Sequence, residues 1–322
     1  MVHRFKQIWC PLRNGLSVSG LEMWLVDKTA FEISYLRDLE VVEGWNKNTQ
    51  YGTFVQAGIE GYIKHRDPKL AAFFIQKEFE KQIKQYEDYE DICWWAQLAQ
   101  SQVQTWIDLY AKDLDTCGIT RSEVHHKIDL ELPSGRKICL HGYIDGEGDD
   151  ILMENKCRGE WDEESIANEI DLNLQVNMYL LFHKARTGSL PKKVWYQHIR
   201  RPGGFAYRGP RKKAKESNEQ YRRRLADAVD SDRDYHFYRY WVLPDEERFQ
   251  RFTHLCLYPM LEAFLDWYFY MIHPNRKDEV NKYHWVTPYG LYNPFLEGTQ
   301  ERFRNFRLTG STLGLRPKVH YR

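Results

Sequence analysis

The sequence has no cysteine pair at metal-binding spacing and no long apolar segment. Its six cysteines are scattered among 322 residues without a C-x-x-C pair, which argues against a zinc knuckle and a disulfide framework. The most apolar stretch, 255–272, contains Glu262 and Asp266, whereas a membrane-spanning helix needs about 20 nearly uncharged residues. The first ten residues contain no apolar signal segment. We therefore expect a cytoplasmic protein with free thiols and no membrane partner.

Net charge is also lacking, because 46 basic side chains balance 46 acidic ones. This balance argues against a protein that coats nucleic acid nonspecifically, although it allows a local basic groove. Aromatic residues make up 15% of the chain, enough bulk for a sizeable core. Intrinsic disorder and fibrous repeats are therefore excluded as descriptions of the whole chain.

The pattern of apolar residues divides the chain into three parts. Residues 1–120 show helical spacing, with segments at 17–40, after Gly52, at 68–86 and at 91–115. Residues 121–200 read as strands at 123–132, 137–145 and 151–157, a helix at 163–186 and a strand at 191–200. Residues 201–322 begin with a basic loop, followed by a strand at 235–242, a helix at 244–271 and fifty irregular residues. We expect this last part to belong to the same domain as the central part.

Two carboxylates and a lysine are predicted to meet at the hairpin between 145 and 154. Asp145 ends one strand, and Glu154 follows nine residues later, across a short turn. Glu154 and Lys156 lie two apart on a strand and therefore share a face. Oxygen ligands of this kind hold Mg²⁺ or Mn²⁺. The alternative is a solvated strand face with ordinary turn chemistry, because a D-x₈-E-x-K pattern often arises by chance.

Neighbouring motifs strengthen the metal-site interpretation. Gln175 and Tyr179 are one helical turn apart, and Gly52, Gln56 and Glu60 recur on one helix face. The whole series resembles the RecB-like branch of the PD-(D/E)XK nuclease superfamily. That branch reads S-x-S, G-x₃-H-x₃-E, G-x-x-D, E-x-K and Q-x₃-Y in this order. The matching segments here are Ser17–Ser19, Gly52–Glu60, Gly142–Asp145, Glu154–Lys156 and Gln175–Tyr179.

The resemblance implies an α/β (α+β) fold of the restriction-endonuclease type, with a mixed central sheet flanked by helices. It also implies a nuclease core at 121–200 and a first motif helix supplied by 1–120. A metal would lie on Asp145, Glu154 and the Asn155 carbonyl, with Lys156 as the catalytic lysine. Gln175 and Tyr179 would lie beside the scissile phosphate or support the site.

The sequence departs from this family in two respects. Gln56 stands where the family has a metal-binding histidine, so we expect a weaker, neutral ligand there, or else a hydrogen bond to a neighbouring strand. The family's iron–sulfur members carry cysteines where this chain has Asp27, Leu291 and Leu296. We therefore expect Mg²⁺ or Mn²⁺ as the cofactor and no iron–sulfur cluster.

A basic run follows the motifs and is interpreted as a DNA-phosphate contact, although such a run is ordinarily a solvated surface. Its candidate DNA-binding residues are Arg200, Arg201, Arg211, Lys212, Lys213, Lys215 and Arg222.

The sequence thus predicts a metal-dependent DNA nuclease. We expect an exonuclease that hydrolyses phosphodiester bonds in phage or bacterial recombination, repair or replication. One alternative is a nuclease-fold DNA-binding protein with weak or no cleavage. A third possibility is a subunit of a larger recombination complex, with other recombination or replication proteins as partners.

Overall fold

The structure is a computed structural model, and it divides the chain into two compact units. Unit 1 comprises 1–43, 127–142 and 250–322, and unit 2 comprises 44–126 and 143–249. The units interleave along the sequence and cross the predicted boundaries at 120 and 200. The structure describes residues 9–41, 45–86, 89–159, 163–164, 166, 170–202, 212–272 and 315–317.

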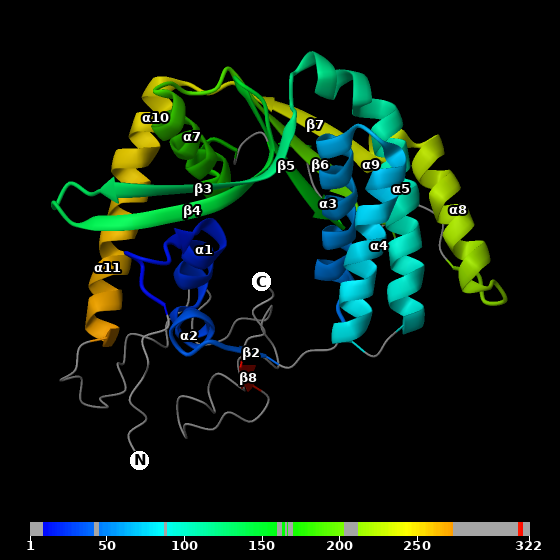
Figure 1. The fold of residues 1–322 in the computed structure, drawn as a ribbon, viewed down its shortest axis with the longest axis horizontal. Coiled ribbons are helices and arrows are strands. Elements are labelled where there is room, and N and C mark those ends of the chain that lie inside the picture. The colour runs from blue at the N-terminus through cyan, green and yellow to red at the C-terminus, as the bar shows by residue number, and fades with distance from the viewer. Residues whose placement is uncertain are drawn as a thin grey trace. The chain divides into compact units, whose positions relative to one another are not determined.

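A mixed sheet forms the centre of unit 2 (Figure 1). The last residues of β4 pair antiparallel with β5, β5 pairs parallel with β6, and β6 pairs antiparallel with β7. Strand β3 pairs with β4 outside this path. The predicted mixed sheet flanked by helices is thereby confirmed. The strands are β3 (Arg121–Glu131), β4 (Lys137–Glu147), β5 (Ile151–Arg158), β6 (Lys193–Arg200) and β7 (Phe237–Val242).

Helices of the N-terminal third pack together beside this sheet, as Figure 1 shows. Helix α3 contacts β5, and α8 packs on α5. Trp106 of α5 is fully buried and donates its indole N–H to Gln197 Oε1 of β6 at 2.8 Å, which satisfies the buried indole N–H and the Gln197 side-chain oxygen. The helices of the N-terminal third are α3 (Lys47–His65), α4 (Pro68–Gln85) and α5 (Tyr89–Thr116), and α8 covers Asn218–Ser231.

The prediction of a continuous helix over 163–186 is wrong in its extent. A 3₁₀ turn, η2, covers Ile170–Leu172, and the regular helix α7 covers Leu174–Thr187. The reason is Asn173, whose side chain accepts a hydrogen bond from the Val176 N–H at 3.0 Å. Asparagine is favoured at such an N-cap over a helix interior, so the regular helix begins there.

Unit 1 surrounds a separate aromatic group. Strand β1 (Leu16–Ser17) pairs parallel with the first part of β4, and Ser17 caps α1 (Val18–Val26). Trp9 makes edge contacts with Phe31 and Phe264, at centroid distances of 5.4 and 6.1 Å. The remaining elements at this end are α2 (Lys28–Phe31), η1 (Glu32–Leu36) and β2 (Leu39–Val41).

The predicted long helix at 244–271 is interrupted. Helix α10 (Glu246–Phe252) leads into a π turn, η3 (Thr253–Leu257), before α11 (Tyr258–Ile272). Pro259 has no backbone N–H to continue the regular ladder, which accounts for the wider turn before it. Within the predicted irregular end, β8 (Leu315–Pro317) pairs antiparallel with β2, whereas Leu291 and Leu296 lie outside the described residues. Among the helices described, none combines the length and apolarity needed to cross a membrane.

Close approach of two backbones makes Gly148 a testable position in unit 2. A Cβ there would lie 2.7 Å from the Gly118 carbonyl oxygen and 3.1 Å from its carbon. We expect Gly148→Ala to lower the free energy of unfolding by about 1–3 kcal/mol, because a backbone neighbour cannot rotate away. Urea denaturation measures this change. Gly52→Ala is the control, because its Cβ would meet only Cys157 Cβ at 3.5 Å, an ordinary van der Waals contact. Alanine is more stable than glycine within a helix, so this variant should not lower the free energy of unfolding.

Candidate functional site

A pocket of about 430 Å³ lies within unit 2 and contains most of the predicted catalytic and metal-binding residues, but none of the predicted DNA-binding residues. Helix α3 supplies Gln56 and Glu60, and α7 supplies Gln175. The end of β4 supplies Asp145, the middle of β5 supplies Glu154 and Lys156, and α4 supplies Glu78. Segments separated by about a hundred residues therefore meet at one cavity.

The β4–β5 hairpin brings the two predicted carboxylates together. The ladder pairs Glu147 with Leu152 and Gly146 with Met153, so the same register carried one step further sets Asp145 opposite Glu154. Asp145 Oδ2 also accepts a hydrogen bond from the Asn155 N–H at 2.7 Å. The predicted juxtaposition across the hairpin is therefore present.

Lys156 is held as a cation against a buried carboxylate. Its Nζ lies 2.6 Å from Oε1 of Glu154, whose side chain is only 1% exposed. Burial would lower the pKa of Lys156, but the charge and hydrogen bond of Glu154 outweigh it and raise the pKa above its usual value. Lys156 is therefore suited to stabilising negative charge and unsuited to accepting a proton at neutral pH.

A chain of hydrogen bonds connects Lys156 to the opposite strand through α7. Lys156 Nζ donates to Gln175 Oε1, and Gln175 Nε2 in turn donates to the Tyr179 hydroxyl at 2.7 Å. Tyr179 donates to the Tyr143 carbonyl of β4 at 2.6 Å. The helical spacing of Gln175 and Tyr179 thus orients the lysine, which is a supporting role.

Asp145 lies in a strongly negative environment. Burial, followed by the charges of Glu154 and Glu123, raises its pKa well above the ordinary aspartate value, against the opposing Asn155 N–H and Lys156. The Ser122 hydroxyl donates to the Asp145 backbone carbonyl at 2.6 Å and fixes this end of β4. The site therefore has an excess of negative charge that a bound cation would relieve.

Gln56 reaches the pocket, and its amide makes the hydrogen bond to a neighbouring strand that was the second expectation for it; the partner on that strand is a residue that the sequence did not indicate. Gln56 Nε2 donates to Glu123 Oε1 at 2.7 Å. Glu123 lies on β3 with a left-handed backbone, φ 52°, which a non-glycine residue rarely adopts. Burial raises the pKa of Glu123, and the nearby Glu60 and Glu154 raise it further. No sequence signal marks Glu123, because charged residues at strand ends are common.

The chemistry of these donors suits a hard divalent cation. All the candidate ligands are oxygen atoms, and Glu154 Oε2 is buried with no hydrogen-bond partner within the described chain. As they stand, no three His, Cys, Asp or Glu side chains among the described residues converge closely enough to hold a metal ion. Lys156 and the Asn155 N–H engage one oxygen of each carboxylate instead. An ion would therefore compete with these two contacts.

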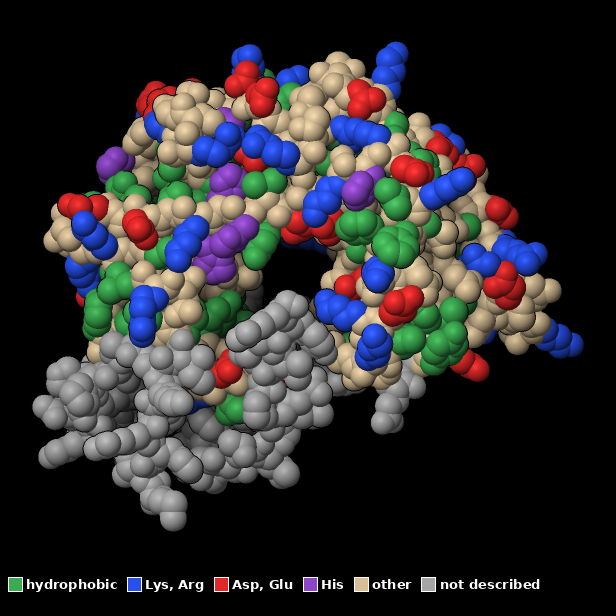
Figure 2. Space-filling model, in the orientation of Figure 1, with side chains coloured by type: hydrophobic (Ala, Val, Ile, Leu, Met, Phe, Trp, Pro, Cys, Tyr) green, Lys and Arg blue, Asp and Glu red, His purple; other side chains and the backbone are tan. Residues whose placement is uncertain are grey.

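The predicted DNA-contacting residues have differing environments. Arg201 is buried, and this burial lowers its pKa. The Arg200 guanidinium lies over the Tyr235 ring, 4.1 Å from the ring centroid. Arg222 pairs with Glu219 at 2.6 Å. Figure 2 shows positive and negative side chains interspersed over the visible face of α4 and α5. Lys212, Lys213 and Lys215 are exposed, and Arg211 lies outside the described residues.

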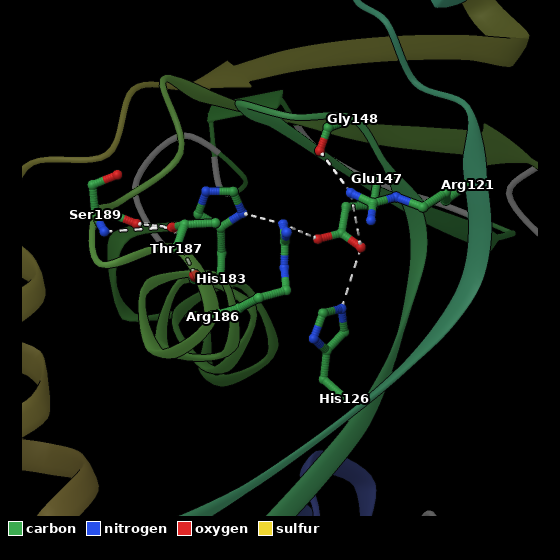
Figure 3. Close-up of polar contacts among 8 residues, drawn as sticks. All are labelled: Arg121, His126, Glu147, Gly148, His183, Arg186, Thr187 and Ser189. Carbon is green, nitrogen blue, oxygen red and sulfur yellow. Dashed lines mark hydrogen bonds and ion pairs between the residues drawn. The ribbon is translucent and has the colours of Figure 1, made fainter.

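A second polar cluster anchors the end of β4, two residues beyond Asp145 (Figure 3). Glu147 is fully buried, and its carboxylate contacts Arg186 of α7 at 2.7 Å. His126 Nε2 and Arg121 Nη2 of β3 lie 3.3 and 3.7 Å from its other oxygen. Arg186 lies between Glu147 and His183. Glu147 therefore connects α7 and β3 to the strand that carries Asp145.

Comparisons with known proteins add little to this description. No family model matches the chain, and no curated protein matches it. One solved structure, described as the crystal structure of SSO0001, is similar over 70% of this chain and 95% of its own, at 13% identity and a TM-score of 0.27. A likeness of this degree carries no argument about function.

Proposed function

We propose that the pocket is the active site of a Mg²⁺- or Mn²⁺-dependent deoxyribonuclease. The observation that carries the proposal is the convergence of Asp145, Glu154 and Lys156 on one pocket, with Gln175 holding the lysine. Two carboxylates with a fixed ammonium group suit hydrolysis of a phosphodiester, whose transition state gathers negative charge on phosphate oxygens.

Each residue of the pocket has a distinct role in this proposal. Asp145, Glu154 and the Asn155 carbonyl would hold the divalent cation, which supplies an activated water and neutralises phosphate charge when bound. Lys156 donates hydrogen bonds to the developing negative charge, and Gln175 limits the positions its ammonium group can take. Tyr179 ties this arrangement to the β4 backbone through the Tyr143 carbonyl.

Cleavage of end-labelled DNA tests this proposal. Linear duplex, single-stranded and closed circular DNA are each incubated with Mg²⁺, Mn²⁺ or EDTA. We expect cleavage with Mg²⁺ or Mn²⁺ and none with EDTA. Mononucleotide release from linear DNA, with circular DNA left intact, would identify an exonuclease. Absence of cleavage on every substrate with both metals contradicts the nuclease proposal.

The principal alternative is DNA binding with weak or no cleavage, and it is favoured by the engagement of Gln56 with Glu123 in place of the family's histidine. Filter binding in EDTA detects this activity separately. Other recombination or replication proteins remain proposed partners, and size measurement with and without DNA tests for such a larger assembly.

Two exposed lysines allow a matched test of the basic segment. If Lys213 and Lys215 contact DNA phosphates, their joint replacement by alanine should weaken binding to all sequences alike. The slope of log K against log salt should also fall by about 0.7–0.9 for each phosphate that is no longer neutralised. Lys81→Ala is the control, because that lysine pairs with Glu78 on α4. An unchanged slope in the double variant contradicts the assignment.

A further inference from the structure

Another positively charged group lies beyond the pocket on the strand that carries Lys156. Arg158 ends β5, two residues after Lys156, and residues two apart on a strand share a face of the sheet. Cys157 is the last residue of β5 that lines the pocket, and Arg158, which follows it, is exposed. The cationic face that begins at the lysine in the pocket therefore continues to the surface, about 6.6 Å further along the strand.

The adjacent strand β6 adds an arginine at the same level. The parallel ladder of β5 and β6 pairs Arg158 with Arg200. Neighbouring strands lie about 4.8 Å apart, so the two arginine side chains start from adjacent positions on one face. Arg200 Nε donates to the Tyr235 carbonyl at 3.0 Å, and its guanidinium lies over the Tyr235 ring. These two contacts fix the position of the second guanidinium.

The pKa of His198 reports the charge of this face. His198 is fully buried, and the same ladder pairs it with Lys156. Burial, followed by the charges of Arg158, Lys156 and Arg200, lowers its pKa to about 4. Every charge among these causes is positive. Three cationic groups from two strands therefore lie close to one imidazole.

Arg158 lacks an acidic partner in the described part of the chain. Its side chain forms no ion pair or hydrogen bond with any residue that the structure describes. Burial, followed by the charge of Glu163, raises the pKa of Tyr238 on β7, but this carboxylate is not paired with Arg158. Like charges at facing positions of neighbouring strands repel each other, which lowers stability. An anion bound at the two arginines would remove this repulsion.

We propose that Arg158, with Arg200 beside it, binds the phosphate next to the scissile one on the same DNA strand. The proposal rests on the proposed function, because it takes the phosphate held at Lys156 as the scissile one. Contacts to phosphates fix the register of a strand and carry no sequence information. The substrate is thus a polyanionic strand of any sequence, which passes over the carboxyl ends of β5 and β6.

Binding of a single-stranded oligonucleotide in EDTA, measured over a range of salt concentrations, tests this inference on the full chain. Arg158→Gln should weaken binding by about 10-fold at low salt, because it removes a charge-assisted hydrogen bond to phosphate. The slope of log K against log salt should become smaller. Replacing Arg200 as well should complete a fall of about 0.7, the change expected for one phosphate on a single strand. Arg158→Lys should restore the slope but only part of the affinity, since lysine lacks the planar fork of arginine.

Two controls separate a phosphate contact from a structural role. Arg248→Gln removes an arginine that is 68% exposed and pairs with Asp171 at 2.8 Å, and it should leave the affinity and the salt slope unchanged. Thermal unfolding of Arg158→Gln without DNA should occur at the wild-type temperature or above, because a repulsion between like charges is removed. A large fall in this temperature with an unchanged salt slope would make Arg158 a structural residue and overturn the inference.

The outcomes for binding and for cleavage are separable. If Arg158→Gln binds with wild-type affinity and slope while the wild type cleaves DNA with Mg²⁺ or Mn²⁺, the proposed function stands and the phosphate contact is overturned. If the variant has a lower affinity and slope but the wild type cleaves no DNA, the phosphate contact stands and the nuclease proposal fails. Absence of DNA binding by the wild type overturns the phosphate contact, whatever the cleavage activity.

Discussion

Replacement of Lys156 by alanine is expected to reduce the rate of DNA cleavage by about 100-fold or more. The lysine is the one ammonium group in the described pocket that is held by both Glu154 and Gln175, and its removal takes away a preorganised donor to the transition state. Single-turnover cleavage of end-labelled DNA measures the chemical step directly. Asp145→Ala and Glu154→Ala should reduce the rate by a similar factor, because each removes a proposed metal ligand.

Matched variants show whether the lower cleavage rate of Lys156→Ala comes from loss of the ammonium group at the site or from loss of the fold. Lys192→Ala removes an exposed lysine that pairs with Asp150 at the start of β6, and it should leave the rate unchanged. Lys156→Arg keeps a positive charge and should retain more activity than Lys156→Ala. Circular dichroism at the assay temperature confirms that each variant is folded. Full activity in Lys156→Ala would contradict the assignment of this residue.

Replacement of Glu147 by glutamine is expected to lower the free energy of unfolding by about 2–3 kcal/mol at pH 7. Its carboxylate is fully buried and forms ion pairs with Arg186 and Arg121, with His126 beside it. Breaking a fully buried ion pair costs about 3–5 kcal/mol. The expected cost is smaller here because the two arginine side chains are 38% and 45% exposed and can be hydrated again.

The effect of Glu147 on stability should depend on pH. Burial would raise the pKa of Glu147, but the hydrogen bond from His126 and the charges of His126, Arg121 and Arg186 hold it below its usual value of 4.5. A lowered pKa in the folded state stabilises the protein above the unfolded value, and that stabilisation is lost as the pH falls through the folded value. The difference in free energy of unfolding between wild type and Glu147→Gln should therefore be complete at pH 7 and become progressively smaller below about pH 4.5.

Urea denaturation between pH 7 and pH 3.5 measures this difference. Glu131→Gln is the control, since its carboxylate is 65% exposed and lies 3.8 Å from Lys137. A surface change of this kind should alter the free energy of unfolding by less than about 0.5 kcal/mol. A difference between wild type and Glu147→Gln that stays constant with pH would show that the carboxylate charge does not stabilise the fold.

Local patterns in the sequence were sufficient to predict the hairpin that carries the site. Alternation of apolar and polar residues indicated β4 and β5, and the short turn between them set Asp145 opposite Glu154. The four-residue spacing of Gln175 and Tyr179 likewise indicated one helix face, which lies against Lys156 and the Tyr143 carbonyl. These predictions succeeded because each depends on residues close together in the chain.

Local sequence patterns did not predict other features of the structure. The interruption at Asn173 follows from a capping hydrogen bond that competes with the helical ladder, and helical periodicity alone does not reveal it. The three-residue strand β8 forms only because β2, far away in the sequence, presents a partner edge. A segment this short has too few alternating positions to predict a strand.

The sequence by itself determined the chemistry available to this protein, namely two carboxylates and a lysine on a strand hairpin beside a glutamine–tyrosine helix face. Only the tertiary structure decided which further groups join them. Gln56 meets Glu123 across 67 residues, and Glu147 is buried among cations from β3 and α7. Such contacts depend on how helices and strands pack, because the desolvation and charge balance of a carboxylate arise only from neighbours that the fold brings together.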